Sequence, residues 1–237
     1  TALLLDGVGS VGLPTQRLAT NVGSLAGTVN SGTLAFDNAS SLTLEPVSVS
    51  TTPTGPMGAL PVTPRLQSGS TLTVGAAPSV GEGLFVTVVG DLVVASGGAA
   101  DAVAVTQALP VLWQTTGNQN WNGVFDYAGG TGTVRAGGFV TISATGAIRS
   151  NGGDLSVEVV SDFTLDAGGT IALVSGIGIL NSGENLTVEG AISTSGAVAL
   201  NADDFILAGV AGGPIRVTAA DLILTAGDGI GTDTSAL

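Results

Sequence analysis

The chain has 237 residues, of which 44% are hydrophobic and 10% are charged, and its formal net charge of −13 disfavours binding to nucleic acid. Its five cationic residues are all arginines, and the absence of lysine, histidine and cysteine excludes disulfides, Cys/His zinc sites, histidine-activated nucleophiles and P-loops. No segment approaches the roughly 20 uninterrupted apolar residues that a membrane-spanning helix needs, so we expect no membrane insertion.

Short apolar segments, mostly of three residues, recur along the chain beside Gly, Asn or Asp. In a three-residue strand the outer two side chains point to one face and the middle one to the other, so each segment can bury two side chains. Val, Thr, Ile and Leu favour strands, whereas frequent glycines disfavour helices. In chain order the segments are 42–44, 71–74, 163–165, 171–173, 186–188, 205–207 and 222–224.

Strands this short are not stable alone, so we predict a single domain over residues 1–237 in which similar turns stack into one apolar column. Ile192 and Val210 are 18 positions apart, and Val210 and Ile230 are 20 apart. The expected fold is therefore all-β, a parallel β-helix (β-solenoid) with about three short strands per turn of roughly 20 residues. Glycine pairs such as Gly168-Gly169 are expected at the corners, because glycine tolerates positive φ angles.

Two segments depart from this rhythm. Residues 46–67 contain five of the nine prolines, which cannot supply the hydrogen-bond donors of a strand ladder. Residues 107–131 contain both tryptophans and the only tyrosine beside a polar run. We predict a Pro-rich loop insertion at 46–67 and an aromatic, polar insertion at 107–131.

Five stretches, three of which contain glycine, are built from short sequences of the same kind: Gly12–Ala26, Leu34–Asp37, Ser41–Leu44, Ile148–Leu155 and Leu222–Thr232. They resemble repeats of the filamentous-haemagglutinin-like adhesins, which are large secreted proteins of bacteria. The resemblance implies a right-handed parallel β-helix that is extracellular, either secreted or on the bacterial cell surface. It implies an architecture much more specifically than an activity.

The two ends of the chain also resemble each other. An offset of 219 positions pairs Leu3 with Leu222 and Leu5 with Leu224. On one interpretation the chain is one period of a longer tandem array, and on a second it is a subunit whose last turn continues into the first turn of the next copy. The alternative is that any two turns of such a solenoid align about this well. The first two interpretations predict an end-to-end interface at these four leucines.

Four aromatic residues are the candidate contacts for a ligand or partner: Trp113, Trp121, Phe125 and Tyr127. Exposed aromatic rings beside Asn and Gln would suit the faces and hydroxyls of sugars. The alternative is a small core that pins the segment to the rod. The sequence favours the core without excluding the platform.

Two sets of acidic residues are weaker candidates. Asp203-Asp204 is similar to the paired carboxylates of β-helical polysaccharide hydrolases, but those enzymes also present a histidine and a lysine, which this chain lacks. Asp6, Asp228 and Asp233 could offer oxygens to Ca²⁺, yet no calcium-binding spacing accompanies them. Solvated, turn-stabilising aspartates are the favoured interpretation of both sets.

We therefore expect a structural or adhesive β-solenoid, a repeat or subunit of a bacterial cell-surface fibre or coat that stacks end to end, with no catalysis and no cofactor. Its expected partners are other copies of itself, with host or matrix glycans as a further class. The alternative is a β-helix that binds carbohydrate, or one that degrades polysaccharide through carboxylates alone.

Overall fold

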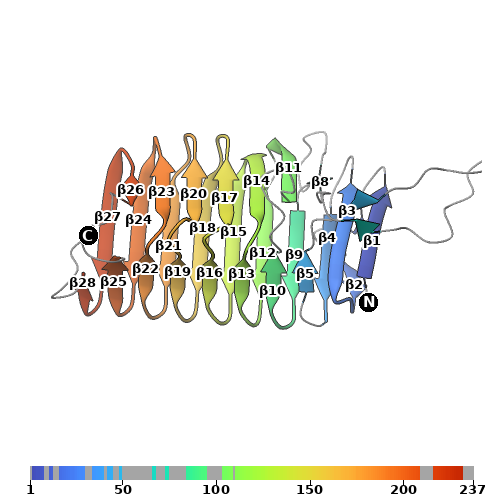
Figure 1. The fold of residues 1–237 in the computed structure, drawn as a ribbon, viewed down its shortest axis with the longest axis horizontal. Helices are drawn as coiled ribbons and strands as arrows, with labels where there is room; N and C mark the ends of the chain where they lie inside the picture. The colour runs from blue at the N-terminus through green and yellow to red at the C-terminus, as the bar shows by residue number, and fades with distance from the viewer. Residues whose placement is uncertain are drawn as a thin grey trace, which may run out of the picture.

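The computed structural model describes residues 2–7, 11–12, 16–29, 34–39, 42–44, 48–49, 66–67, 73–74, 84–94, 103–108, 110–208 and 216–231. Within these residues the fold is an all-β solenoid, in which parallel strands stack side by side from the N-terminal end to the C-terminal end (Figure 1). The part of the chain described here contains no helix that could cross a bilayer.

Three faces make up the solenoid, and each regular turn contributes one strand to each face. The long face is the nine-stranded sheet, and the short and third faces together form the 17-stranded sheet. These two faces are joined because β3 (Ser24–Val29) pairs with β5 on the short face and with β8 on the third, while β1 (Ala2–Gly7) pairs with β3.

The strands of the long face are β2 (Leu18–Thr20), β4 (Leu34–Asn38), β9 (Leu84–Val88), β12 (Val111–Thr115), β15 (Thr131–Ala136), β18 (Asp154–Val159), β21 (Gly178–Ser182), β24 (Ala197–Ala202) and β27 (Asp221–Ala226). Those of the short face are β5 (Leu42–Leu44), β10 (Leu92–Val94), β13 (Gln119–Trp121), β16 (Val140–Ile142), β19 (Phe163–Leu165), β22 (Leu186–Val188), β25 (Phe205–Ala208) and β28 (Gly229–Ile230). Those of the third face are β8 (Thr73–Val74), β11 (Val103–Ala108), β14 (Val124–Gly129), β17 (Ala147–Ser150), β20 (Thr170–Leu173), β23 (Ala191–Thr194) and β26 (Val217–Thr218).

About five turns of about 23 residues form the regular part of the solenoid, which confirms the predicted fold class and turn length. One inward column of the long face traces these turns. Its members pair in register as Trp113, Val134, Val157, Leu180, Leu200 and Leu224. The first five are buried, so the apolar core runs without interruption through the stack.

The three-residue strands behave as their sequences predict. In β16, β19 and β22 the outer two side chains are buried and the central threonine is half-buried. Thr141, Thr164 and Thr187 are in register with one another on the outside of the short face. The alternation therefore follows from the two-residue period of a strand.

The described residues of the segment 107–131 form regular strands of the solenoid rather than the expected insertion. Gln119–Trp121 pairs with Leu92–Val94 on one side and with Val140–Ile142 on the other. The polar residues did not indicate a strand, because Gln119 points into the core, where its amide is hydrogen-bonded.

The predicted insertion at 46–67 lies almost entirely outside the described residues and stays a prediction. Two short stretches of it are described: β6 (Ser48–Val49) and β7 (Leu66–Gln67) pair in antiparallel fashion. This pairing brings the two ends of the segment together.

Corner glycines serve two different purposes. Gly168 has a φ of 98°, the left-handed conformation that the sequence predicts for a corner. Gly153 is needed because a side chain there would collide with the carbonyl oxygen of Gly130 and the ring of Tyr127. Glycine therefore allows both tight corners and close contact between turns.

The register of the last turns differs from the spacing inferred from the sequence. Ile192 pairs with Val217 on the third face, whereas Ile230 pairs with Ile206 on the short face. The two isoleucines thus belong to different faces, and Val210 lies outside the described residues. The predicted turn of roughly 20 residues is nevertheless close to the observed 23, although the residues from which it was inferred lie on two different faces.

Candidate interaction surfaces

The four aromatic candidates form one cluster inside the solenoid. Each is at most 2% exposed. Trp113 makes edge-to-face contacts with Trp121 and Phe125, and Phe125 stacks on Tyr127 with ring centroids 5.4 Å apart. No face of these rings is open at the surface, so they cannot form the sugar platform that the sequence left possible, and they build the core instead.

A buried polar network accompanies the aromatic cluster. Trp121 Nε1 donates to Gln119 Oε1 at 3.2 Å, and Gln119 Nε2 donates to the carbonyl oxygen of Arg135 at 2.8 Å and to Thr115 Oγ1 at 3.3 Å. Trp113 Nε1 is buried and has no hydrogen-bond partner within the described part of the chain. The two tryptophans therefore differ in hydrogen bonding although both are buried.

Burial also changes the acidity of two groups near this cluster. It raises the pKa of Tyr127 to about 12, and the phenol donates to the carbonyl oxygen of Asp154 at 2.8 Å. Burial raises the pKa of Asp126 as well, and the nearby Arg149 guanidinium opposes that rise. In both groups burial disfavours the charged form, because charge is poorly solvated there.

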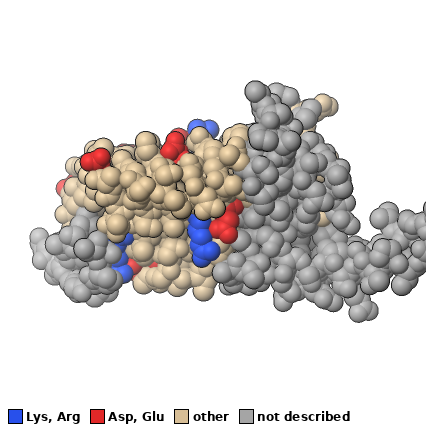
Figure 2. All heavy atoms as spheres, turned by 90° about the horizontal axis from the view of Figure 1, so that it is seen from above, with Lys and Arg blue, Asp and Glu red and all other residues tan. Residues whose placement is uncertain are grey.

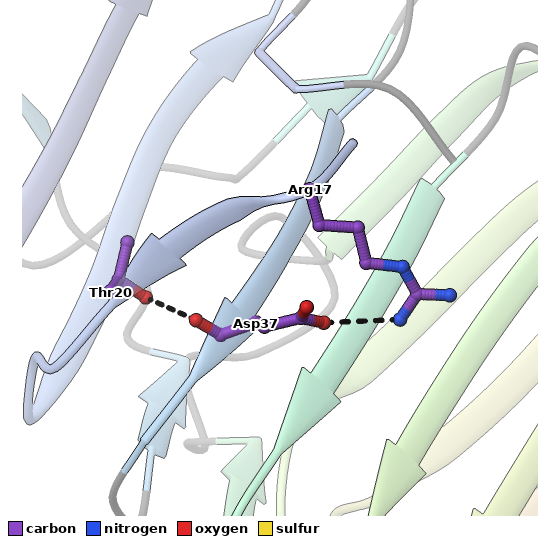
Figure 3. A network of polar contacts seen from close by, with 3 residues as sticks. All are labelled: Arg17, Thr20 and Asp37. Carbon is purple, nitrogen blue, oxygen red and sulfur yellow. Dashed lines mark hydrogen bonds and ion pairs between the residues drawn. The ribbon is translucent and has the colours of Figure 1, made fainter. Parts of the chain in front are cut away.

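Near the N-terminal end, an ion pair links Asp37 in β4 to Arg17, the residue just before β2 on the long face. Arg17 Nη1 lies 3.2 Å from Asp37 Oδ1, and Thr20 Oγ1 donates to the carbonyl oxygen of Asp37 at 3.1 Å (Figure 3). The Asp37 side chain is about half exposed. An exposed pair of this kind contributes at most about 1 kcal/mol to the stability of the fold. We therefore expect it to affect the alignment of the two turns more than their stability.

A column of polar side chains continues along the outside of the long face. Its members pair in register as Gln114, Arg135, Glu158, Asn181, Asn201 and Thr225. Arg135 Nε lies 2.7 Å from Glu158 Oε2, and Asn201 Nδ2 donates to Asn181 Oδ1 at 2.8 Å. Sequence reasoning missed this column; its signal was the spacing of one turn between Arg135 and Glu158. On the side seen in Figure 2, charged side chains are few among the described residues.

The C-terminal end presents core residues that no described turn covers. Leu222 is 47% exposed, although its register partner Val198 is fully buried. Ile230 is 49% exposed, and its partner Ile206 is fully buried. Leu224 is half-buried and packs against the core. Leu222 and Leu224 are two of the four leucines that the sequence predicts for an end-to-end interface, and that interface stays a prediction. Ile230 was not among the predicted interface residues, although the turn-length spacing from Ile206 could have indicated it.

At the opposite end of the stack, Leu3 and Leu5 lie in β1 (Figure 1). Leu5 is 9% exposed, and Leu3 is half-buried against the core. The strands β1 and β27 have the same length at the offset of 219, yet β1 belongs to the 17-stranded sheet and β27 to the nine-stranded sheet. The structure therefore places the four predicted interface leucines at the two ends, on different faces.

The acidic candidates do not converge on one site. Asp203 is exposed and Asp204 half-buried, at the corner that joins β24 to β25. Asp6 and Asp228 lie at opposite ends of the solenoid, and Asp233 lies outside the described residues. The described residues contain no group of three or more acidic side chains that could hold a metal ion.

In comparisons with protein-family models, curated proteins and solved structures, none matches this chain.

Proposed function

We propose that this protein is an extracellular structural or adhesive β-solenoid. It would be a subunit or repeat of a bacterial cell-surface fibre or coat in which successive copies stack end to end. The observation that carries the proposal is the open core at the C-terminal end. Leu222 and Ile230 continue two fully buried columns, yet each is about half exposed. A further turn of the same kind would bury both side chains.

The driving force for such stacking is burial of apolar area at an edge that can also pair its backbone. Each half-exposed aliphatic side chain gains on the order of 1 kcal/mol when it is covered. The last strand of a parallel sheet also offers N–H and C=O groups to another strand. The net charge of −13 opposes side-by-side association more than growth along the axis, because side-by-side contact brings larger charged surfaces together.

An extracellular location is supported by the resemblance to secreted adhesins. The proposed role is mechanical, so it needs neither catalysis nor a cofactor. The alternative of a carbohydrate-binding or polysaccharide-degrading β-helix gains no support from the aromatic residues, which are buried.

Sedimentation velocity of the full chain over a range of concentrations tests the proposal. We expect the sedimentation coefficient to rise with concentration for the natural chain. Leu222→Asp should weaken this association at least about tenfold, because a carboxylate buried without a partner costs several kcal/mol. Ile223→Asp is the matched control, since Ile223 lies in the same strand, is 56% exposed and is on the outside of the long face.

Circular dichroism of both variants establishes that the β-structure is retained. A natural chain that remains monomeric at every concentration would contradict end-to-end stacking. Equal effects of the two substitutions would also contradict it, because they would assign association to the outer face.

A further inference from the structure

The sequence contains two Asn-Gly pairs, Asn122-Gly123 and Asn151-Gly152. In such a pair the glycine nitrogen can attack the asparagine side-chain amide, because glycine has no β-carbon to hinder the approach. The reaction needs an accessible asparagine and a glycine N–H that is free to leave its hydrogen bond. The two pairs differ strongly in both respects.

Asn151-Gly152 lies at the corner between β17 and β18, and both residues are exposed. The Gly152 N–H is 3.3 Å from Ser150 Oγ, beyond the usual range of a strong hydrogen bond, whereas Gly153 N–H bonds the same oxygen at 2.7 Å. A β-carbon built on Gly152 would meet only Ser175 Oγ, at 3.6 Å. The backbone at Gly152 therefore has room to move.

Asn122-Gly123 lies at the corner between β13 and β14, where the glycine is buried. Gly123 N–H donates to the carbonyl oxygen of Val94 at 3.0 Å, and its own carbonyl accepts from Ala147 N–H at 3.1 Å. The Asn122 carbonyl accepts from Thr145 Oγ1 at 2.8 Å. Attack by the Gly123 nitrogen would first require these bonds between turns to open.

We propose that Asn151-Gly152 is a site of spontaneous deamidation in the folded protein and that the fold protects Asn122-Gly123. The Gly152 nitrogen forms a bond to Asn151 Cγ, and the bond from Cγ to the side-chain nitrogen breaks. That nitrogen leaves as ammonia, with the proton from Gly152. Water then opens one of the two carbonyls of the cyclic imide, which gives either aspartate or isoaspartate.

The product replaces a neutral amide with a carboxylate and, as isoaspartate, adds a methylene to the backbone. The added length falls between the end of β17 at Ser150 and the start of β18 at Asp154, so it does not shift the register of either strand. Arg149 lies two residues before Asn151 and is exposed, which places a cation near the new charge. In a long-lived protein the fraction of chains modified at this corner would thus increase with time while the fold is retained.

The experiment is a time course of the folded full chain in mildly alkaline buffer, with a parallel time course in denaturant. Trypsin cuts this lysine-free chain after arginine, so Asn122 and Asn151 are recovered in separate peptides, 66–135 and 150–216. Mass spectrometry locates the lost amide, and an isoaspartyl methyltransferase labels the isoaspartate. We expect Asn151 to react at least about tenfold faster than Asn122 in the folded chain, which corresponds to about 1.4 kcal/mol of opening energy.

In denaturant the two rates should converge, because the protecting bonds are gone. Gly152→Ala should slow the reaction at Asn151 and leave Asn122 unchanged, and the open space at Gly152 allows this variant to fold. Equal rates in the folded chain, or no reaction at Asn151, would overturn the proposal. A rate difference that persists in denaturant, or a Gly152→Ala chain that reacts at the natural rate, would overturn it as well.

Discussion

The ring of Tyr127 occupies the space that the missing side chain of Gly132 leaves inside the solenoid. A β-carbon built on Gly132 would lie 3.0 Å from Tyr127 Cζ and Oη. In the next turn the sizes are reversed, because the small Ser150 takes the place of Tyr127 and the large Leu155 takes the place of Gly132. In the turn after that the first order returns, and Leu173 lies against Gly178. Large and small inward residues thus alternate across this corner and keep the core filled.

Gly132→Ala should destabilise the protein by about 1–3 kcal/mol, because the Tyr127 ring is held by Phe125 and by its hydrogen bond to Asp154 and cannot move away. Gly178→Ala is the matched control: its β-carbon would lie an ordinary 3.4 Å from Leu173 Cδ1. We expect that variant to be neutral or slightly stabilising, since alanine loses less conformational freedom on folding. Urea denaturation measures both, and equal changes in the two variants would disprove this account of the corner.

The two tryptophans provide a comparison of a satisfied and an unsatisfied buried donor. Trp121→Phe leaves Gln119 Oε1 without its indole donor, whereas Trp113→Phe removes an N–H that makes no hydrogen bond within the described residues. Both lose similar volume, so we expect Trp121→Phe to be less stable than Trp113→Phe by about 1–3 kcal/mol. The midpoints of urea denaturation, compared at an unchanged dependence of the free energy of unfolding on urea concentration, report the difference in stability. Equal stability of the two variants would show that the Trp121 bond contributes nothing.

Tyr127 should make stability fall steeply in alkaline solution. Its pKa is raised to about 12 in the folded protein from 10.0. Between these values the unfolded phenol loses its proton while the folded one keeps it, so the free energy of unfolding falls as pH rises. The contribution is complete below pH 10 and amounts to on the order of 3 kcal/mol.

This titration can be measured cleanly, because the chain has one tyrosine and no lysine. Phenolate absorbance should appear near pH 12 in the folded protein and near pH 10 in denaturant. Tyr127→Phe should remove the alkaline loss of stability. Ionisation at the same pH in the folded and denatured chains would contradict the burial of this ring.

The sequence was sufficient to predict the fold, because each apolar triplet carries the two-residue period of a strand and glycine marks the corners. It was insufficient for the segment 107–131, because Gln119 is polar yet buried, and its shortest amide hydrogen bond is to a carbonyl oxygen of the neighbouring turn, that of Arg135. The same limit applies to the aromatic cluster, whose burial depends on the turns on either side. Register also needed the structure: Ile192 and Ile230 look alike in sequence and belong to different faces.

Electron microscopy of the natural chain at increasing concentration tests the central claim most directly. If turns stack end to end, the particles should be rods one solenoid wide that lengthen with concentration while their width stays constant. Dispersed particles of one length at every concentration, or sheets that widen, would contradict the proposal.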